Sequence, residues 1–344
     1  MRAAVLHEAG GPLVIEDVPI PEVGPHEVLV RVASCGLGLT LVWNRNGRRT
    51  DGRLPRIIGH EISGDVVTVG SAVAAFRVGD RVAVYYYLTC GYCHWCVRGR
   101  EDLCDNQSGR VGRHIDGGLA EFVALPARNL CLLPPDLGYA DAAVACDAIA
   151  TPIHVFRRRA RLQPGETVLV LGGGGGVGVH MIRTAVAFGA RALATDLSDD
   201  KLAVATAAGA ARAINSTKED LHDAVMVFTQ GRGADVVIDM VGIDSTLRSG
   251  IAVLGKGGRM VLVGSYDGSS TLSVRHETLG GERAVMGSSY CTRSELADAL
   301  QLVAQGFIRT SITRTCDLSE ADAVLRAIER KEMAGRACVV FDHP

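Results

Sequence analysis

Long hydrophobic runs are absent from this 344-residue sequence: nowhere do 18 or more apolar residues follow one another, so no membrane span is predicted. The N-terminal residues 1–8 hold too short an apolar run for a secretory signal, and we therefore expect a cytoplasmic protein. A strong charge of either sign is also lacking, because the formal net charge is −2. This near-neutral balance excludes an electrostatic surface for nucleic acid or anionic membrane and leaves a small-molecule substrate as the expected partner.

The ten cysteines are unevenly distributed, since four of them cluster and six are isolated. Without an export signal, such a cluster favours metal binding over disulfides. Four thiolates at this spacing can close a tetrahedral zinc site and leave no position open for water or substrate. We therefore predict a structural zinc lobe, at about residues 90–104, held by Cys90, Cys93, Cys96 and Cys104.

The length exceeds what one hydrophobic core usually supports, so two domains are expected. The first part is rich in Val and is bounded by Gly, Pro and Asp, which predicts a β-rich domain with strands near residues 2–6, 28–33, 62–69 and 81–85. Beyond about residue 148, strands alternate with apolar helices. This alternation predicts an α/β domain in which helices cover both faces of a parallel sheet.

The expected strands of the second part are 167–171, 191–195, 235–239 and 259–263, and the expected helices are 177–188, 198–208 and 245–254. Two further helices, near 293–305 and 318–330, precede a last strand at 336–341. Because a lone strand needs a sheet to join, we expect this tail to return to the first domain.

A glycine-rich turn follows the strand at 167–171 and opens the next helix, with the pattern Gly173-x-Gly175-x-x-Gly178. Between a strand and a helix, this pattern predicts a dinucleotide site. We expect Gly173 to permit the tight turn, Gly175 to let the backbone approach the pyrophosphate, and Gly178 to let the helix pack on the strand. The helix N-terminus then offers N–H groups to the phosphates.

An acidic residue, Asp196, follows the next strand and can accept the hydroxyls of the adenosine ribose. Its charge would repel a 2′-phosphate, and residues 197–200 contain no arginine to reverse that preference. NAD(H) is therefore favoured over NADP(H). Lys201 can also reach the ribose, although a solvated helix lysine is an equal alternative.

Several motifs in a fixed order resemble the zinc-dependent alcohol dehydrogenase family of the medium-chain dehydrogenase/reductase superfamily. They are Gly59-His60-Glu61 with residues 62–67, then 78–82, the four-cysteine lobe, 117–122 and the glycine-rich turn. The resemblance covers essentially the whole chain. It implies a GroES-like substrate domain of residues 1–147 and 289–344, a Rossmann NAD-binding domain of residues 148–288, and a homodimer or homotetramer.

In that family a second, catalytic zinc is bound by a cysteine in Cys-x-Thr-Asp, the histidine of Gly-His-Glu, and a later cysteine or aspartate. The resemblance implies His60 as one ligand, with Glu61 beside it, and Asp147 as another. Cys146 is the near alternative to Asp147, because the register is uncertain by one residue.

The first cysteine ligand is missing, because Gly38 occupies its position and Leu41 that of the neighbouring aspartate. Thr40, which handles the substrate proton in the family, is retained. The three remaining candidates, His60, Glu61 and Asp147, could still form a zinc site, since carboxylate oxygens bind zinc. The opposite interpretation is a polar pair without metal.

The resemblance implies an NAD(H)-dependent oxidoreductase that interconverts an alcohol and an aldehyde or ketone by hydride transfer. With zinc, the metal would polarise the substrate oxygen. Without zinc, hydrogen bonds from Thr40 and His60 would do so. This weaker activation favours an alternative, a zinc-independent reductase of conjugated C=C or C=N bonds. A third hypothesis is a non-catalytic NAD-binding protein.

Further cofactor contacts are implied by the same resemblance. Arg336 matches an arginine that contacts the pyrophosphate, and residues that follow the sheet strands are expected to line the nicotinamide pocket. The remaining expected cofactor-binding residues are Thr151, Gly176, Val177, Val241, Val263 and Gly264.

Overall fold

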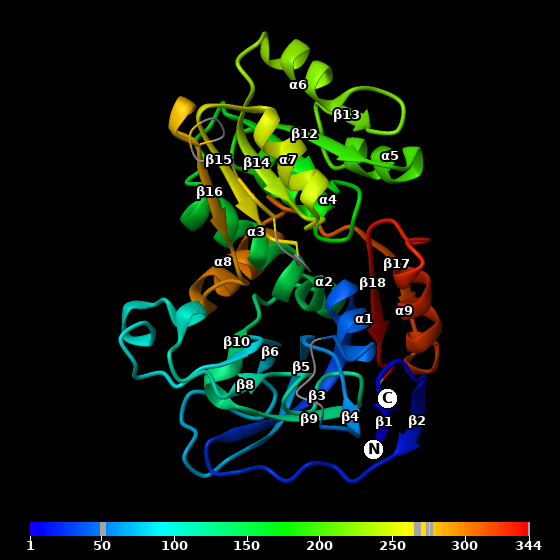
Figure 1. Cartoon of the computed structure of the whole chain (residues 1–344). Helices are drawn as coiled ribbons and strands as arrows, with labels where there is room; N and C mark the ends of the chain where they lie inside the picture. The colour runs from blue at the N-terminus through cyan, green and yellow to red at the C-terminus, as the bar shows by residue number, and fades with distance from the viewer. Residues whose placement is uncertain (49–52, 265–269, 273–274, 276–277, 343–344) are drawn as a thin grey trace. The chain divides into compact units, whose positions relative to one another are not determined.

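The computed structural model describes residues 1–48, 53–264, 270–272, 275 and 278–342 (Figure 1). The chain divides into two compact units: unit 1 consists of residues 1–150 and 291–344, and unit 2 of residues 151–290. Within the described ranges, no helix is both long and apolar enough to cross a membrane.

Unit 2 is built on a parallel sheet with the strand order β13-β12-β11-β14-β15-β16. Its strands are β11 (Thr167–Leu171), β12 (Arg191–Asp196), β13 (Arg212–Asn215), β14 (Ala234–Asp239), β15 (Leu254–Leu262) and β16 (Ala284–Gly287). Its helices are α4 (Gly178–Ala187), α5 (Asp199–Ala207), α6 (Leu221–Thr229) and α7 (Asp244–Ala252), and α3 (Ala150–His154) leads into the unit.

Both faces of this sheet are covered, as the alternation of side chains along the central strand shows. Every residue of β11 is buried. Val168 and Val170 pack in one core cluster with residues of α4 and α5, whereas Leu169 and Leu171 pack in a second cluster with residues of α6 and α7. Because successive side chains of a strand point to opposite faces, the helices form two layers around the sheet.

Unit 1 is rich in strands, and its largest sheet has the order β10-β6-β5-β3-β18-β17, with β9 also paired to β3. The strands are β1 (Arg2–Leu6), β2 (Leu13–Asp17), β3 (Glu27–Leu37), β4 (Arg56–Ile57), β5 (Glu61–Val69), β6 (Arg81–Val84), β7 (Tyr87–Leu88), β8 (Gly109–Arg110), β9 (Phe122–Pro126), β10 (Leu130–Leu132), β17 (Ile312–Cys316) and β18 (Arg336–Val340). The helices are α1 (Leu39–Arg45), α2 (Tyr139–Val144), α8 (Arg293–Ala304) and α9 (Ala321–Glu329).

The last strand, β18, pairs antiparallel with β3, so the tail returns to the first domain as expected. The expected fold class, α/β with a β-rich domain and a doubly wound parallel sheet, is confirmed. Two helices are shorter in the structure than the sequence predicts. Leu254 belongs to β15, where it pairs with Ala234, and residues 318–320 form a 3₁₀ turn before α9.

Candidate functional site

The glycine-rich turn at the end of β11 brings the chain back toward β12. The amide groups of Gly172 and Gly173 both donate to the carbonyl of Thr195, at 2.9 and 3.0 Å. The left-handed backbone of the turn falls at Gly172, with φ of 78°. A Cβ on Gly173 would lie 2.7 Å from the Cβ of Ala194, so this glycine serves close packing against β12.

The other two glycines of the motif differ in what surrounds them. A Cβ on Gly178 would collide with the carbonyl oxygen of Gly172, so α4 can begin this close to the turn only with glycine there. A Cβ on Gly175 would meet nothing closer than 3.4 Å. Gly175, Gly176 and Val177 are half-buried, and Val177 is the N-cap of α4. A methyl group at Gly175 would therefore fit, with the carbonyl oxygen of Gly172 as its one neighbour within 4 Å among the described residues.

Asp196 is fixed beside this turn at the end of β12. Its Oδ2 accepts the amide of Gly174 at 3.1 Å, and its Oδ1 accepts the amide of Leu197 at 2.9 Å. A carboxylate has about four acceptor positions, so this anchored group can accept further hydroxyls. The backbone of Lys201 lies against the same turn, since a Cβ on Gly174 would be 2.6 Å from its carbonyl oxygen.

A buried aspartate that the sequence interpretation overlooked organises the neighbouring edge of the sheet. Asp239 is fully buried at the end of β14, and its side chain accepts the amides of Val241 and Gly242 at 2.8 and 3.1 Å. Its carbonyl accepts the amides of Val263 and Gly264 at 3.0 and 2.9 Å. The sequence does contain a sign of this residue, because an acidic residue at the end of an apolar strand is unusual. Thr151, another expected cofactor residue, is buried in α3.

In unit 1, three predicted residues from distant parts of the chain lie together. His60 precedes β5, Glu61 begins it, and Asp147 lies in a π-helical turn at residues 145–149. One ligand atom from each lies within 4.8 Å of the others. The Nε2 of His60 is 3.3 Å from Oδ2 of Asp147 and 4.0 Å from Oε1 of Glu61.

Cys146, the alternative to Asp147, points elsewhere: its Sγ contacts the carbonyls of Ala142 and Ile62.

The ring of His60 also packs against Tyr86, with 4.4 Å between the ring centroids and an angle of 41° between the ring planes. Burial raises the pKa of Tyr86 to about 12, although nearby Arg110 acts in the opposite direction. Tyr86 therefore keeps its phenolic proton at neutral pH and covers His60 as a neutral ring.

Arg336, the first residue of β18, joins the same cluster. Its Nη2 forms an ion pair with Oε2 of Glu61, and both side chains are buried. Burial raises the pKa of Glu61, Arg336 opposes this shift, and Asp147 adds to it. The sequence interpretation assigned Arg336 to the cofactor pyrophosphate and did not foresee its contact with Glu61.

The guanidinium of Arg336 also fills the space beside Gly38. A Cβ on Gly38 would lie 2.5 Å from its Nη1 and 3.1 Å from its Cζ. Gly38 is the N-cap of α1, and the half-buried Thr40 follows in the first turn. The position that carries a cysteine ligand in the resembling family therefore faces a cation in this chain.

A catalytic zinc needs three protein ligands and an open position. Glu61 pairs with Arg336 through Oε2, and its Oε1 lies 4.0 Å from Nε2 of His60, so His60, Glu61 and Asp147 could each offer one ligand atom. A histidine that binds metal usually donates its other ring N–H to an acceptor. Among the described residues, the buried Nδ1 of His60 has no hydrogen-bond partner.

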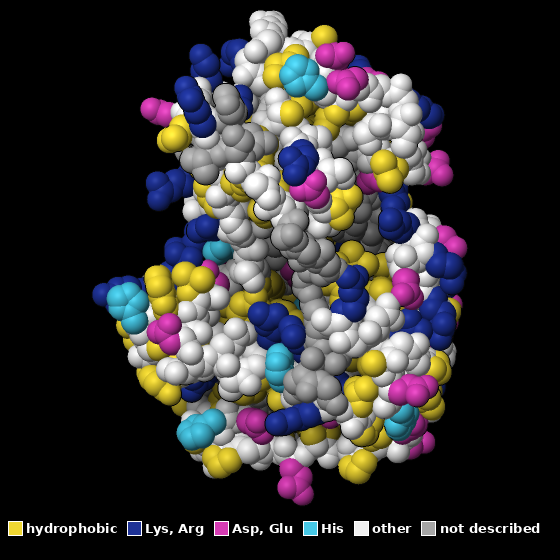
Figure 2. All heavy atoms as spheres, in the orientation of Figure 1, with side chains coloured by type: hydrophobic (Ala, Val, Ile, Leu, Met, Phe, Trp, Pro, Cys, Tyr) yellow, Lys and Arg dark blue, Asp and Glu magenta, His cyan; other side chains and the backbone are white. Residues whose placement is uncertain are grey.

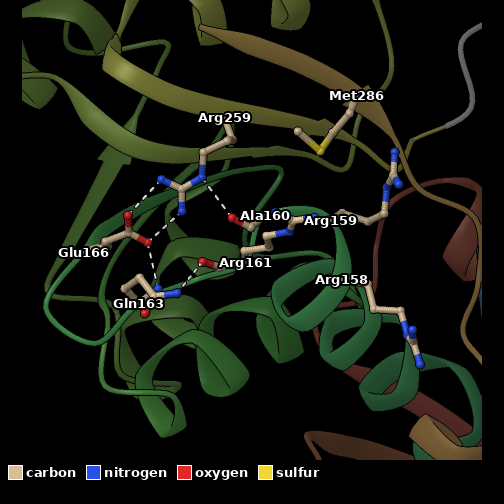
Figure 3. A pocket seen from close by; sticks show the side chains of 8 residues that line it. All are labelled: Arg158, Arg159, Ala160, Arg161, Gln163, Glu166, Arg259 and Met286. Carbon is tan, nitrogen blue, oxygen red and sulfur yellow. Dashed lines mark hydrogen bonds and ion pairs between the residues drawn. The ribbon is translucent and has the colours of Figure 1, made fainter. Parts of the chain in front are cut away.

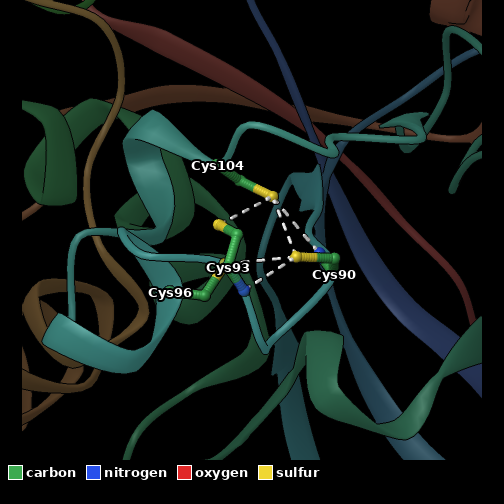
Figure 4. Close-up of side chains that lie close together, drawn as sticks. All are labelled: Cys90, Cys93, Cys96 and Cys104. Atoms are coloured by element: carbon green, nitrogen blue, oxygen red, sulfur yellow. Dashed lines mark hydrogen bonds between the residues drawn. The ribbon is translucent and has the colours of Figure 1, made fainter.

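The four clustered cysteines are arranged differently (Figure 4). Their Sγ atoms lie within 4.8 Å of one another, with separations of 3.6 Å for Cys90–Cys104, 3.9 Å for Cys90–Cys96 and 4.0 Å for Cys93–Cys104. A tetrahedral zinc with Zn–S bonds of about 2.3 Å requires separations of about 3.8 Å. Such distances are far too long for a disulfide. The four thiols therefore fit a closed zinc site.

Backbone groups reinforce this arrangement. The amide of Cys90 donates to Sγ of Cys104 at 3.3 Å, and the amide of Cys93 donates to Sγ of Cys90 at 3.4 Å. Desolvation acts to raise the pKa of Cys90, but backbone N–H donors of Tyr92 and Cys93 lower it to about 6. Backbone N–H donors likewise lower the pKa of Cys93, whereas burial raises the pKa of Cys104 and raises that of Cys96 to about 12.

A cavity of about 610 Å³ opens elsewhere in unit 2 (Figure 3). Arg259 in its wall donates to both carboxylate oxygens of Glu166, at 2.8 and 2.7 Å, and to the carbonyl of Ala160 at 2.9 Å. Glu166 precedes β11, and Arg259 lies in β15 beside residues at the start of β14 and β16. The cavity is therefore at the amino ends of the strands, opposite the glycine-rich turn. On the face drawn in Figure 2, cationic and anionic side chains are interspersed.

Two family models match the chain. The alcohol dehydrogenase GroES-like domain matches residues 24–135, and the zinc-binding dehydrogenase family matches residues 176–305. An NAD-dependent alcohol dehydrogenase of Sulfolobus acidocaldarius is 32% identical over 346 residues, covering 98% of each chain.

Solved structures are similar over the full length. The crystal structure of AibC is 35% identical with a TM-score of 0.92, covering 100% of this chain and 96% of that one. A putative zinc-binding dehydrogenase of Sinorhizobium meliloti, bound to NADP, is 28% identical with a TM-score of 0.89, covering 99% of each chain.

Proposed function

The chain belongs to the zinc-binding alcohol dehydrogenase family, and from this we propose that it is an NAD(H)-dependent oxidoreductase that interconverts an alcohol and an aldehyde or ketone. The observation that carries the proposal is the glycine-rich turn of unit 2, with the half-buried Gly175 and the anchored carboxylate of Asp196. A bound nicotinamide would accept or donate the hydride. The other groups required are side chains that bind the substrate oxygen and exchange its proton.

Unit 2 would hold the cofactor through its backbone. The start of α4 at Gly178 offers N–H groups and a partial positive charge to the two phosphates. Asp196 would accept the ribose hydroxyls and repel a 2′-phosphate, so NAD(H) is preferred. We assign Lys201, Val241, Val263 and Gly264 to the same site, since they lie at or beside the carboxyl ends of the strands.

Unit 1 would supply the proton chemistry. His60 and Asp147 are within hydrogen-bond distance, so they can hold one proton and pass it between a substrate oxygen and solvent. The side chain of Asp147 is 18% exposed, whereas that of His60 is 1% exposed. Asp147 can therefore exchange a proton with solvent, and His60 is shielded from it. Thr40, half-buried after Gly38, adds a hydroxyl that can donate to the same oxygen.

We also propose that Cys90, Cys93, Cys96 and Cys104 hold a structural zinc. The closed set of four thiolates would fix the lobe at residues 90–104 and supply no chemistry to the reaction. All ten cysteines are free thiols in the structure, which suits a reducing cytoplasm.

A second candidate is a reductase of conjugated C=C or C=N bonds. The observation that favours it is Gly38, which offers no thiolate to a catalytic metal, because a site without a metal polarises a carbonyl less strongly and suits activated substrates.

Two measurements test these functions. NADH should bind purified protein, read as a shift in nicotinamide fluorescence, and NADH should be oxidised with a panel of aldehydes and ketones. Asp147→Asn should reduce kcat by about 100-fold with little change in NADH affinity, as expected for loss of a proton-transfer group. Turnover of enones or imines alone would select the second candidate. Binding without any turnover would indicate a non-catalytic protein, and absence of binding would refute the proposal.

We propose that the chain forms a homodimer or homotetramer. Strand β16 is an edge strand of the unit 2 sheet, and the backbone N–H and C=O groups on its outer side can pair with those of a second copy. Light scattering after size-exclusion chromatography should give a mass of two or four chains, and a mass of one chain would refute this.

A further inference from the structure

A loop at residues 109–117 holds two arginines close to the segment of unit 1 that carries His60. A Cβ on Gly112 would lie 2.3 Å from the carbonyl oxygen of Gly59, and a Cβ on Gly117 would lie 2.0 Å from the same oxygen. The loop can approach Gly59 this closely only because both residues are glycine. Since Gly59 directly precedes His60, the loop lies beside the proposed proton-transfer pair.

The first of these arginines, Arg110, lies over the aromatic side chains next to His60. It belongs to β8, and in the pairing of β8 with β7 its partner is Tyr87. Its Cζ is 4.8 Å from the ring centroid of Tyr87 and 5.9 Å from that of Tyr86, distances at which a ring face attracts a cation. Because Tyr86 also packs against His60, Arg110 and His60 are both neighbours of the Tyr86 ring.

The second arginine, Arg113, lies near the same ring. Burial raises the pKa of Tyr86, Arg110 and Arg113 oppose this shift, and Asp147 adds to it. Arg113 follows Gly112, and its amide donates to the carbonyl of Arg110 at 3.3 Å. Among the described residues, the buried Nε of Arg113 has no hydrogen-bond partner, and neither guanidinium forms an ion pair. The two cations therefore have donors to offer.

The carboxylates of this region are already engaged. Glu61 forms an ion pair with Arg336, and Asp116, in the same loop as the two arginines, forms one with Arg56 at 3.1 Å. Asp147 is within hydrogen-bond distance of the histidine. Both loop arginines are half-buried, and a guanidinium in such a place can bind carboxylate or phosphate oxygens through parallel N–H groups. The loop thus offers positive charge to an external anion.

From these contacts we propose that the substrate carries an anionic group, a carboxylate or a phosphate, which Arg110 and Arg113 bind while the reacting oxygen lies at His60. The proposal rests on the proposed function, because it names the substrate class of that site. Arg113 would donate to the anion, and Arg110 would add charge from the face of Tyr87. Both residues determine specificity and take no part in the proton transfer.

Calorimetric binding of matched small molecules provides the test, and it needs no activity measurement. Benzoate with benzamide, and phenyl phosphate with phenol, are two pairs whose members differ in charge. With excess NADH present, wild-type protein should bind at least one anion about tenfold more tightly than its neutral partner. The pair that shows this preference identifies the anionic group as carboxylate or phosphate. Arg113→Gln should weaken the binding of that anion about tenfold, as expected for the loss of a charge-assisted hydrogen bond.

Three further variants separate charge from structure. Arg113→Lys keeps a cation and should recover part of the affinity that Arg113→Gln loses. Arg110→Gln should also weaken the anion and leave the neutral partner unchanged. Arg77→Gln is the matched control, because the side chain of Arg77 is 89% exposed and lies outside the loop, and it should bind the anion as the wild type does. If Arg113→Gln does not fold, the wild-type preference and Arg110→Gln still decide.

Two results would overturn the proposal. One is equal affinity of wild-type protein for the charged and neutral members of both pairs. The other is anion binding that stays unchanged in Arg110→Gln and Arg113→Gln.

Failure of this proposal is distinguishable from failure of the proposed function. Turnover of neutral aldehydes by a protein without anion preference would reject the anionic substrate and keep the dehydrogenase. Arginine-dependent anion binding without turnover of any carbonyl compound would reject the dehydrogenase and keep the anion site.

Discussion

The two units present their proposed ligand sites by different means. Unit 2 uses mainly its backbone, since glycines at 172–178 bring the chain close to β12 and leave space for a ligand. Unit 1 uses side chains that come from distant segments, such as Glu61 and Arg336, which are separated by 275 positions. A backbone site depends on the absence of side chains and tolerates no additions. A side-chain cluster depends on the balance of charge among its members, so exchanging one member can change its chemistry.

The largest effect is expected from Cys104→Ser in unit 1. Removing one of four thiolates should release the zinc and lower Tm by about 10 °C, corresponding to about 4 kcal/mol of unfolding free energy. Thermal unfolding and metal analysis measure both. Cys316→Ser, a buried cysteine of β17 outside the lobe, is the control and should keep the zinc. Unchanged zinc content in Cys104→Ser would contradict a four-thiolate site.

The next effect tests whether the unit 2 site depends on its backbone. Gly175→Ala places a methyl group where we propose that the pyrophosphate binds and should weaken NADH binding by about 100-fold, or ~2.7 kcal/mol. Tm should hardly change, because the added Cβ meets nothing closer than 3.4 Å. Fluorescence titration with NADH measures the loss. Gly287→Ala, where a Cβ meets no atom within 4 Å, should bind NADH normally. Equal affinities would place the cofactor elsewhere.

A smaller effect concerns an ion pair that stabilises unit 2 away from its proposed site. Glu166→Gln should reduce the unfolding free energy by about 2 kcal/mol at pH 7, because Arg259 loses its charged partner. Burial acts to raise the pKa of Glu166, but hydrogen bonds from Arg259 and the amide of Gln163 lower it overall.

The sign of the pH dependence follows from that lowered pKa. Glu166 contributes its full stabilisation above its unfolded pKa of about 4.3, and the contribution is lost as pH falls through the lower folded value. The difference between wild type and Glu166→Gln should therefore be largest near pH 7 and shrink below about pH 4. Denaturant unfolding at several pH values measures it, and a difference that grows in acid would contradict the assignment.

The smallest effect sharpens the comparison within unit 2, where one side chain contributes specificity. Asp196→Asn keeps an oxygen that can accept the amide of Gly174 and removes the charge. The preference for NADH over NADPH should fall by about tenfold, or ~1.4 kcal/mol. The ratio of the two dissociation constants is the measurement. Asp200→Asn, an exposed position in α5, should leave the ratio unchanged.

The sequence predicted best the features that depend on short spacing. The strand, glycine turn and helix at 167–188 and the cysteines at 90–104 are local patterns, and the structure has the turn and the clustered thiols. The motif did not specify that Gly172, which precedes it, is the left-handed residue of the turn. Which of several consecutive glycines takes a positive φ depends on the hydrogen bonds to Thr195, and these come from another strand.

The sequence could not predict the contacts that depend on tertiary packing. It placed His60 and Asp147 in one cluster only through a family resemblance, and it left the choice between Cys146 and Asp147 open. The π-helical turn at residues 145–149 points Asp147 toward His60 and turns Cys146 toward backbone carbonyls. The pairing of Arg336 with Glu61 requires β18 to lie beside β3, and no local pattern specifies that register.

The place of β18 in the unit 1 sheet has a consequence for biosynthesis. Residues 151–290 are contiguous, so unit 2 can fold on the ribosome while the sheet of unit 1 still lacks an interior strand. Strand β18 is translated last among the strands described and inserts between β3 and β17. The same event delivers the guanidinium to Glu61. Until β18 has joined the sheet, Glu61 lacks its cationic partner, so we expect the polar cluster to form only after this strand is in place.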